Sequence, residues 1–209
     1  LYVKDAEWDM ERLAEFVEKF GKNLDDINVT LDSHHLIDCA HPLFWINSQG
    51  QNPDPFTIIS AKDVHDGVWS PIKAFLKKRM TDYVDTLEAG SRYPLCIWPP
   101  HCLIGSPGHA VHPILFKALQ EWEQENTAWV NYVTKGSNIY TEHYSAVKAE
   151  VPDPEDPTTQ LNTTLVDKLA LCDIIYYGGE ALDYCVANTA RDIAEAFGDD
   201  SYLAKIALL

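Results

Sequence analysis

The sequence predicts an α/β fold that is built around a mostly parallel sheet. Short apolar runs, typical of buried strands, alternate along the chain with segments of helical periodicity. Polar side chains gather where these runs end, as they do at the ligand-binding edge of parallel sheets. A chain of 209 residues with 46% apolar content can bury one sizeable core. We therefore expect a single domain, residues 1–209.

The first predicted elements are an amphipathic helix and a strand. Residues 8–20 repeat apolar side chains at helical spacing, and Gly21 follows as a stop signal. Residues 27–31 favour a strand and lead at once into the polar residues 32–35. This strand is expected to present polar side chains at its carboxyl end.

Three further apolar runs end in the same way, and helical segments alternate with them. Parallel strands have their carboxyl ends at one edge of the sheet, so we expect the polar residues after these runs to lie close together. The predicted strands are residues 95–98, 129–133 and 173–177, and the predicted helices are residues 113–124 and 185–197.

One long segment, residues 45–93, interrupts the alternation. It contains several turn signals and a basic, helix-like piece at residues 72–83. We expect an insertion, which serves either as a lid over the site or as part of a subunit interface. The proline-rich and acidic residues 151–160 cannot continue a helix and are expected to form an exposed loop.

The charge of the chain limits its partners. A net charge of −16 repels nucleic-acid phosphates and anionic lipids, and no basic patch offsets it. We expect a small-molecule partner, and neither nucleic acid nor membrane. The five cysteines form no CxxC pair, and an odd number argues against a fully paired disulfide framework, so a cytoplasmic protein with free thiols is expected.

Asp32 and His34 are candidate metal ligands at the end of a predicted strand. They lie two residues apart, so both side chains can face one side and share an ion. Two solvated loop residues are the commoner explanation of such a pair. His101, at another strand end, and His41, in the intervening loop, could complete a mixed set suited to Zn²⁺, Fe²⁺ or Mn²⁺, although eight histidines also allow a chance cluster.

Cys185 and Lys135 are candidate catalytic residues. Cys185 opens an apparent helix, whose dipole stabilises a thiolate and whose free N–H groups can bind an oxyanion. A buried packing cysteine is the alternative. Lys135 follows a predicted strand and could lower the pKa of the thiol or transfer protons, but most lysines are simply solvated.

Four segments of the chain carry motifs in a specific order. They are NVTLDSHH (28–35), IWPPHCLIGSPGHAVHP (97–113), VTKGSNIYTEHYSA (133–146) and YYGGEALDYCVANTARD (176–192). In this order they resemble the nicotinamidase-like branch of the nicotinamidase/isochorismatase superfamily of cysteine hydrolases. The resemblance implies a three-layer α/β/α sandwich of the isochorismatase type with a mostly parallel sheet.

The resemblance also implies roles for the residues that match these motifs. Cys185 is the nucleophile that attacks an amide carbonyl, and Lys135 assists its thiolate. The backbone N–H groups of Ala181 and Cys185 hold the oxyanion, and a cis peptide is expected between Glu180 and Ala181. Trp98 flanks the substrate ring, with Tyr144 beside it as a weaker candidate. The implied ligands of a divalent metal ion, with Zn²⁺ expected before Fe²⁺ or Mn²⁺, are Asp32, His34, His101 and His41.

The implied activity is that of an amidohydrolase acting on linear amides. It cleaves the C–N bond of nicotinamide or a related small amide through a thioester, as in pyridine nucleotide biosynthesis. The alternatives are an isochorismatase-like hydrolase of another small substrate and a non-catalytic relative that binds a ligand. Members of the superfamily are often homo-oligomers, and the sequence selects no particular number of subunits.

Some features depart from the family pattern. The general base of the family is an aspartate at the end of the first strand, and this chain begins after the place where that strand would lie. Its C-terminal end stops where the family continues. We therefore expect the chain to be a fragment. Glu180 and Leu182 replace residues that are usually small or apolar, which puts nicotinamide itself in question.

Overall fold

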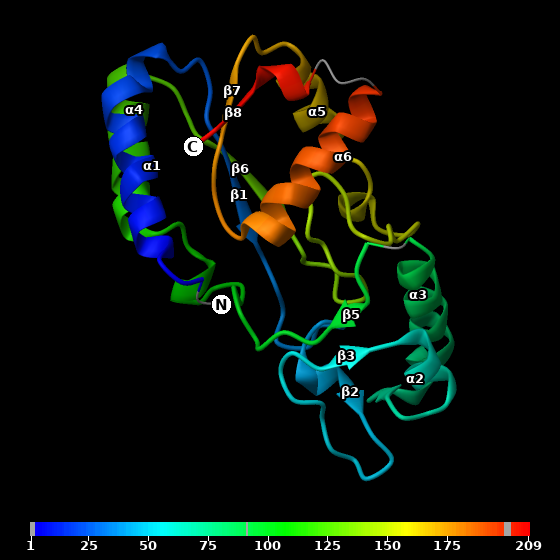
Figure 1. The fold of residues 1–209 in the computed structure, drawn as a ribbon. Helices are drawn as coiled ribbons and strands as arrows, with labels where there is room; N and C mark the ends of the chain where they lie inside the picture. Colours follow the sequence, from blue (N-terminus) through cyan, green and yellow to red (C-terminus); the bar gives the residue numbers. More distant parts are fainter. Residues whose placement is uncertain (1–2, 91, 199–201) are drawn as a thin grey trace.

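Two pairs of parallel strands lie at the centre of the molecule (Figure 1). β1 (Asn28–Asp32) pairs with β6 (Asn131–Lys135), and β7 (Ile175–Tyr177) pairs with β8 (Ile206–Leu208). In the first pair Asp32 lies opposite Lys135, and each is the last residue of its strand. The parallel pairing therefore brings two predicted site residues together. The computed structural model describes residues 3–90, 92–198 and 202–209.

Helices α1 (Ala6–Phe20) and α4 (Pro113–Asn126) lie side by side on one side of β1 (Figure 1). The indole N–H of Trp122 donates a 2.9 Å hydrogen bond to the carbonyl of Gly21 at the end of α1, which fixes the two helices to each other. Burial of their shared apolar surface stabilises the pair. The buried residues of this cluster are Ala14, Val17, Ala118, Leu119, Trp122 and Val130.

Helices α5 (Thr163–Ala170) and α6 (Ala187–Phe197) lie on the other side of the strands (Figure 1). A π-helical turn, Leu182–Val186, leads directly into α6. The predicted helix at residues 185–197 therefore begins three residues earlier, and Cys185 lies within its first turn. The buried residues of this second cluster are Val147, Leu165, Val166, Ile175, Ile193 and Tyr202.

The segment predicted as an insertion has its own hydrophobic core. This core includes Leu95 of β5 (Leu95–Cys96) and Ile97, which follows β5, and both are almost completely buried. Antiparallel pairing joins β2 to β4 and β3 to β5. The insertion is therefore packed against the strand that precedes Trp98. Its elements are β2 (Trp45–Ile46), β3 (Ile58–Ile59), α2 (Ala61–His65), β4 (Ser70–Pro71) and α3 (Lys77–Ala89).

Local sequence signals explain where several helices begin and end. The Ser60 hydroxyl accepts from the N–H of Asp63, whose carboxylate accepts from the N–H of Ser60, and this capping box starts α2. Proline at the first position starts α4. Gly198, at φ 72°, ends α6 in the left-handed conformation. Short 3-10 helices lie at Gly21–Asn23, Pro42–Phe44, Ala74–Leu76, Pro107–His109, Pro157–Thr159 and Leu203–Lys205.

The predicted elements are present, with differences in extent. The predicted helix at residues 72–83 is displaced to α3, and α5 was not predicted, although Asn162 caps it by accepting from the N–H of Leu165. Within the described residues the strands form four separate pairs, two parallel and two antiparallel. Parallel strand pairs are thus present as expected, but the described strands are not joined into the single sheet that the sequence predicted.

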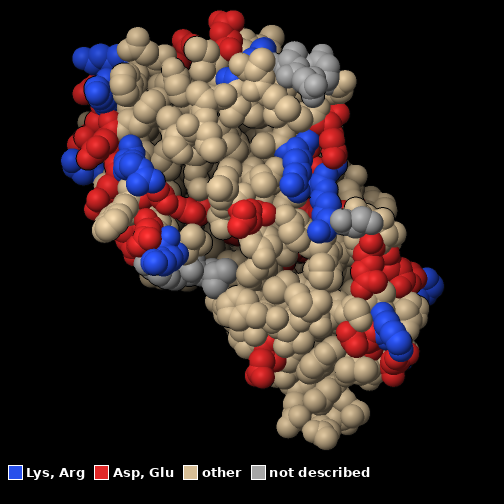
Figure 2. All heavy atoms as spheres, viewed as in Figure 1, with Lys and Arg blue, Asp and Glu red and all other residues tan. Residues whose placement is uncertain are grey.

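Acidic side chains gather on two parts of the face shown in Figure 2, over α1 and over α2 and α3. Most of the basic side chains on this face lie beside them. In the part of the chain that the structure describes, no helix is long and apolar enough to cross a membrane.

Candidate active site

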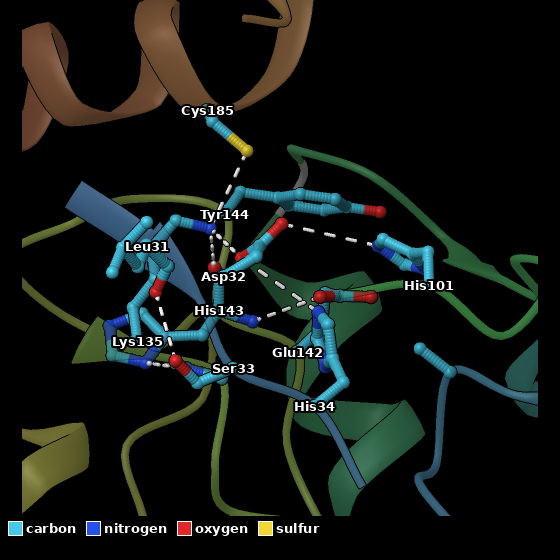
Figure 3. Close-up of polar contacts among 12 residues, drawn as sticks. Leu31, Asp32, Ser33, His34, His101, Lys135, Glu142, His143, Tyr144 and Cys185 are labelled. Carbon is cyan, nitrogen blue, oxygen red and sulfur yellow. Dashed lines mark hydrogen bonds and ion pairs between the residues drawn. The ribbon is translucent and has the colours of Figure 1, made fainter. Parts of the chain in front are cut away.

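The ammonium group of Lys135 connects the two candidate centres of the site (Figure 3). It donates hydrogen bonds to a carboxylate oxygen of Asp32 and, at 2.9 Å, to the carbonyl of His143. Its Nζ also lies 3.5 Å from the sulfur of Cys185. The ends of β1 and β6 and the π-helical turn thus assemble a carboxylate, an ammonium and a thiol in one line of contacts.

The charges of this line depend on burial. Burial alone would lower the pKa of Lys135, but the neighbouring Asp32 and Cys185 raise it above its ordinary value. Burial would raise the pKa of Asp32, but Lys135 and His34 hold it below its ordinary value. The two groups therefore form a buried ion pair at neutral pH.

The thiol of Cys185 differs from the expectation in one respect. Burial raises its pKa more than the nearby Lys135 lowers it, so its pKa lies above the ordinary value. Lys135 acts in the predicted direction, but the sulfur is a neutral thiol in this state. Cys185 also lies within the first turn of its helix, three residues after the helix begins at Leu182, and not at its first position. A nucleophile at this position therefore depends on transfer of its proton to a neighbouring group.

Ala181 precedes the π-helical turn. Its carbonyl accepts hydrogen bonds from the N–H groups of Tyr184 (3.1 Å) and Val186 (3.2 Å). The Glu180–Ala181 peptide is cis, as the resemblance implies. The Ala181 N–H has no hydrogen-bond partner among the described residues, so it is available as a donor.

Asp32, His34 and His101 lie together below Cys185 (Figure 3). Each offers a ligand atom, and these atoms all lie within 4.8 Å of one another. Asp32 oxygens lie 3.8 Å from Nε2 of His34 and 3.9 Å from Nε2 of His101. Two segments far apart in sequence, the end of β1 and the loop after β5, thus bring three potential metal ligands together.

Hydrogen bonds on the outer nitrogens orient these imidazole rings. Nδ1 of His34 lies 3.1 Å from an oxygen of Asp38, and Nδ1 of His101 donates to the carbonyl of Pro99 at 2.9 Å. A carbonyl only accepts, so the Nε2 of His101 keeps its lone pair for a ligand bond. Carboxylate and carbonyl partners of this kind are typical of histidines that bind metals.

His41, the fourth expected ligand, lies beside this cluster but is not one of the residues whose ligand atoms all lie within 4.8 Å of one another. Its Nδ1 donates to the carbonyl of His35 at 3.0 Å, so its Nε2 is also an acceptor. This nitrogen is buried and has no hydrogen-bond partner within the described residues. The His41 ring centroid lies 5.4 Å from the centroids of both His34 and His101. The carboxylate and two imidazoles of the cluster are donors that suit a divalent ion of the zinc type.

The pKa values of two of these histidines agree with that fit. Burial, followed by the nearby His34, lowers the pKa of His101 to about 4. Burial also lowers the pKa of His41. For His34 burial is outweighed by the hydrogen bond to Asp38, and its pKa is raised. Neutral rings and a carboxylate are the forms that bind metal.

Gly136 allows His34 to approach β6. The glycine adopts φ 85°, and a Cβ atom there would lie 2.9 Å from Cε1 of the His34 ring. No side chain fits at this position without displacing the imidazole. The Lys135-Gly136 pair in the sequence therefore serves both centres: the lysine contacts Cys185, and the glycine leaves room for His34.

Aromatic rings line the space beside the nucleophile. The ring of Tyr144 lies between Cys185 and the Asp32–His101 pair in Figure 3, and its hydroxyl accepts a 3.2 Å hydrogen bond from the indole of Trp98. Both predicted substrate-binding residues are thus in contact. The Tyr184 ring joins them, with centroids 5.2 Å from Trp98 and 5.5 Å from Tyr144.

Sequence reasoning missed several members of this site. Tyr184 lies inside a recognised motif, directly before Cys185, whereas Tyr93, 5.3 Å from Tyr144 between ring centroids, has no sequence signal. Glu142 is buried, and burial raises its pKa to about 7. Its neighbour His143 accepts from the N–H of Gly136 at Nδ1 (3.2 Å). Both belong to the Thr-Glu-His-Tyr-Ser segment at residues 141–145, in which the sequence predicted a site role for Tyr144 alone.

Comparison with known proteins identifies the fold. No protein-family model matches the sequence, and the search of curated proteins found no match. Several solved structures match the fold of this chain. The yeast nicotinamidase Pnc1p superposes with a TM-score of 0.59 and 19% identity over 94% of this chain and 74% of that chain. A nicotinamidase/pyrazinamidase of Acinetobacter baumanii gives 0.56 and 23% over 93% and 69%.

A second yeast structure, of Pnc1p bound to the inhibitor nicotinaldehyde, gives a TM-score of 0.59 and 18% identity over the same shares of the two chains. At these identities the likeness concerns the fold. The chain has the nicotinamidase fold, and the resemblance inferred from the four motifs is confirmed at that level.

Proposed function

We propose that this chain is a cysteine amidohydrolase that cleaves the C–N bond of nicotinamide or a related small, linear amide. The observation that carries the proposal is the position of Lys135, whose ammonium contacts Asp32 on one side and the sulfur of Cys185 on the other. The fold likeness to nicotinamidases supports it, and one of those relatives binds nicotinaldehyde.

In the first half of the reaction the sulfur of Cys185 attacks the amide carbonyl. As the sulfur bonds to the carbonyl carbon, the thiol gives its proton to Lys135 while the ammonium of Lys135 passes one of its own protons to Asp32. That proton then goes to the leaving nitrogen, ammonia departs, and a thioester remains on the sulfur. The Ala181 N–H serves as a donor to the oxyanion. Because the pKa of Cys185 is raised, the thiol has to lose its proton during attack, and Lys135 is the group in contact with it.

In the second half water attacks the thioester, which releases a carboxylic acid and restores the thiol. Asp32 is the carboxylate that contacts Lys135, so a proton can pass along Asp32, Lys135 and Cys185. A divalent ion held by the Asp32, His34, His101 and His41 set, for which zinc is proposed before iron or manganese, would supply an anchor for a ring nitrogen of the substrate.

We also propose the three-layer α/β/α arrangement for this domain. The support is the placement of α1 and α4 on one side of the parallel strands and of α5 and α6 on the other (Figure 1). This arrangement leaves the carboxyl ends of β1 and β6 open to a ligand.

Ammonia release from nicotinamide tests the proposed function. We expect turnover by the wild-type protein, and none by Cys185→Ala, with about one metal ion per chain in both samples by elemental analysis. Metal binding without turnover would refute nicotinamide as the substrate. Equal turnover by both proteins would remove Cys185 from the mechanism.

A further inference from the structure

Phe56 occupies an unusual position for a large apolar residue. It lies in the insertion, in the loop before β3, and its side chain is 60% exposed. Its φ of 69° is in the left-handed region, which bulky residues rarely adopt. Such a conformation persists where the surrounding structure imposes it, and it is common at ligand sites.

Backbone hydrogen bonds to the site-bearing strand impose this conformation. The N–H of Phe56 donates to the carbonyl of Ile97, and the N–H of Ile97 donates to the carbonyl of Thr57 at 2.9 Å. The antiparallel pairing of β3 with β5 continues the same ladder. Ile97 is fully buried. Phe56 is therefore fixed to the residue that precedes Trp98.

The result is an edge-on contact between Phe56 and Trp98. Their ring centroids lie 6.0 Å apart, with the ring planes at 85°. Trp98 meets Tyr184 at 5.2 Å and 88°, and Tyr144 at 6.4 Å and 87°. Trp98 thus joins the exposed ring of the insertion to the rings beside the nucleophile.

Trp98 itself is held in place. Its backbone N–H donates to the carbonyl of Ala40 at 2.7 Å, and its indole N–H donates to Tyr144. With a fixed tryptophan, a ring bound beside it would also cover the exposed face of Phe56. Removing that apolar surface from water, together with an edge contact between rings, favours a planar aromatic ligand.

We propose that Phe56 is a specificity-determining residue, which forms the outer wall of the substrate pocket and closes edge-on over the aromatic ring of an amide bound beside Trp98. The insertion thereby selects aromatic amides over aliphatic ones. This inference rests on the proposed function, because it names the substrate class of the same site.

Steady-state kinetics with two amides test the proposal. Nicotinamide and propionamide share the carboxamide group and differ in the ring. For Phe56→Ala we expect the KM for nicotinamide to rise about threefold to tenfold, the magnitude of one lost aromatic contact, with little change in kcat. The KM for propionamide should not change. Phe56→Trp, which keeps an aromatic ring at this position, should retain the wild-type preference for nicotinamide over propionamide.

Phe75→Ala is the matched control, because Phe75 belongs to the same insertion and is 80% exposed. It should leave both KM values as in wild type. Equal effects of Phe56→Ala on the two amides would overturn the proposal, as would an unchanged KM for nicotinamide.

Calorimetric binding of the same two amides to Cys185→Ala separates this inference from the proposed function. If the wild-type protein releases no ammonia from either amide, the proposed function fails. The pocket inference then stands if nicotinamide binds and the additional Phe56→Ala change weakens its binding selectively. It is overturned if nicotinamide does not bind or if the second change has no effect.

Discussion

The Nζ of Lys135 lies 3.5 Å from the sulfur of Cys185, although neither residue is near the other in sequence. The lysine is at the end of β6 and the cysteine is in the turn before α6. The remaining hydrogen bonds of the Lys135 ammonium go to Asp32 and to the carbonyl of His143, so the position of the ammonium is fixed on three sides. This geometry makes the thiol chemistry depend on one buried cation.

Lys135→Met should make Cys185 less reactive. Lys135 lowers the pKa of the thiol, so its loss should move the pH profile of iodoacetamide alkylation upward by about one pH unit or more. Lys168→Met, which removes a partly exposed lysine paired with Asp26, is the control. An unshifted profile would show that the contact has no electrostatic effect on the sulfur.

Lys135→Arg separates charge from proton transfer. Arginine keeps the positive charge but does not release its proton, so the alkylation profile should stay near that of wild type. Ammonia release should still fall by about 100-fold or more. This variant also avoids leaving Asp32 unpaired, which in Lys135→Met is expected to cost about 3–5 kcal/mol of stability. Thermal melting of both variants checks this difference.

Gly136→Ala should disturb His34. The new Cβ would meet the imidazole ring at 2.9 Å, in addition to the backbone cost of φ 85°. Gly67→Ala is a matched control, because Gly67 has φ 76° and nothing within 4 Å of the added atom. We expect Gly136→Ala to lower both the melting temperature and the zinc content more than Gly67→Ala does. Equal losses in the two variants would mean that the close approach is unimportant.

Bound zinc should depend on His34 and His101, which converge on Asp32, and on the proposed fourth ligand His41. Alanine in place of His101 should reduce zinc affinity by at least about tenfold, and His41→Ala should also weaken it because the orphan nitrogen is removed. His65→Ala, which removes an exposed histidine paired with Asp85, is the control. Competition with a fluorescent chelator measures the affinities. Equal zinc affinity in all four proteins would show that the cluster is accidental.

The stability of the fold should respond to the buried His143. Burial, and after it the positive charge of Lys135, lowers the pKa of His143 to about 3, whereas a histidine in an unfolded chain has a pKa of about 6.5. Between these values the unfolded chain binds the extra proton, so unfolding becomes easier as pH falls from about 6.5 towards 3. His143→Asn keeps an acceptor for the N–H of Gly136 and should lose less stability over this range. Urea unfolding at several pH values measures the difference; parallel curves for the two proteins would contradict the prediction.

Sequence reasoning went furthest where local signals agree with tertiary structure. The strand ends at Asp32 and Lys135 were predicted from apolar runs that stop at polar residues, and β1 and β6 end there. The start of the final helix was misplaced, because Leu182 and its neighbours form a π-helical turn that helical periodicity does not indicate. α2 was also missed, although Ser60 and Asp63 carry a capping box.

The raised pKa of Cys185 could not be predicted from the sequence. Motifs place a lysine beside the thiol, but the net effect depends on burial, which outweighs the lysine. The contact of Phe56 with Trp98 was equally hidden, because it depends on the pairing of two short strands across the insertion. Sequence motifs thus indicated that Lys135 and Cys185 meet. The protonation state of Cys185 and the contact of Phe56 with Trp98 depend on three-dimensional packing.

In the proposed mechanism Cys185 carries the acyl group during turnover. Rapid acid quenching of the wild-type protein with nicotinamide, followed by peptide mass spectrometry, detects such a group. We expect a nicotinoyl group on the peptide that contains Cys185, and neither this group nor ammonia release in Cys185→Ala. Ammonia release that persists in Cys185→Ala, with no acyl group on the wild-type peptide, would contradict this mechanism.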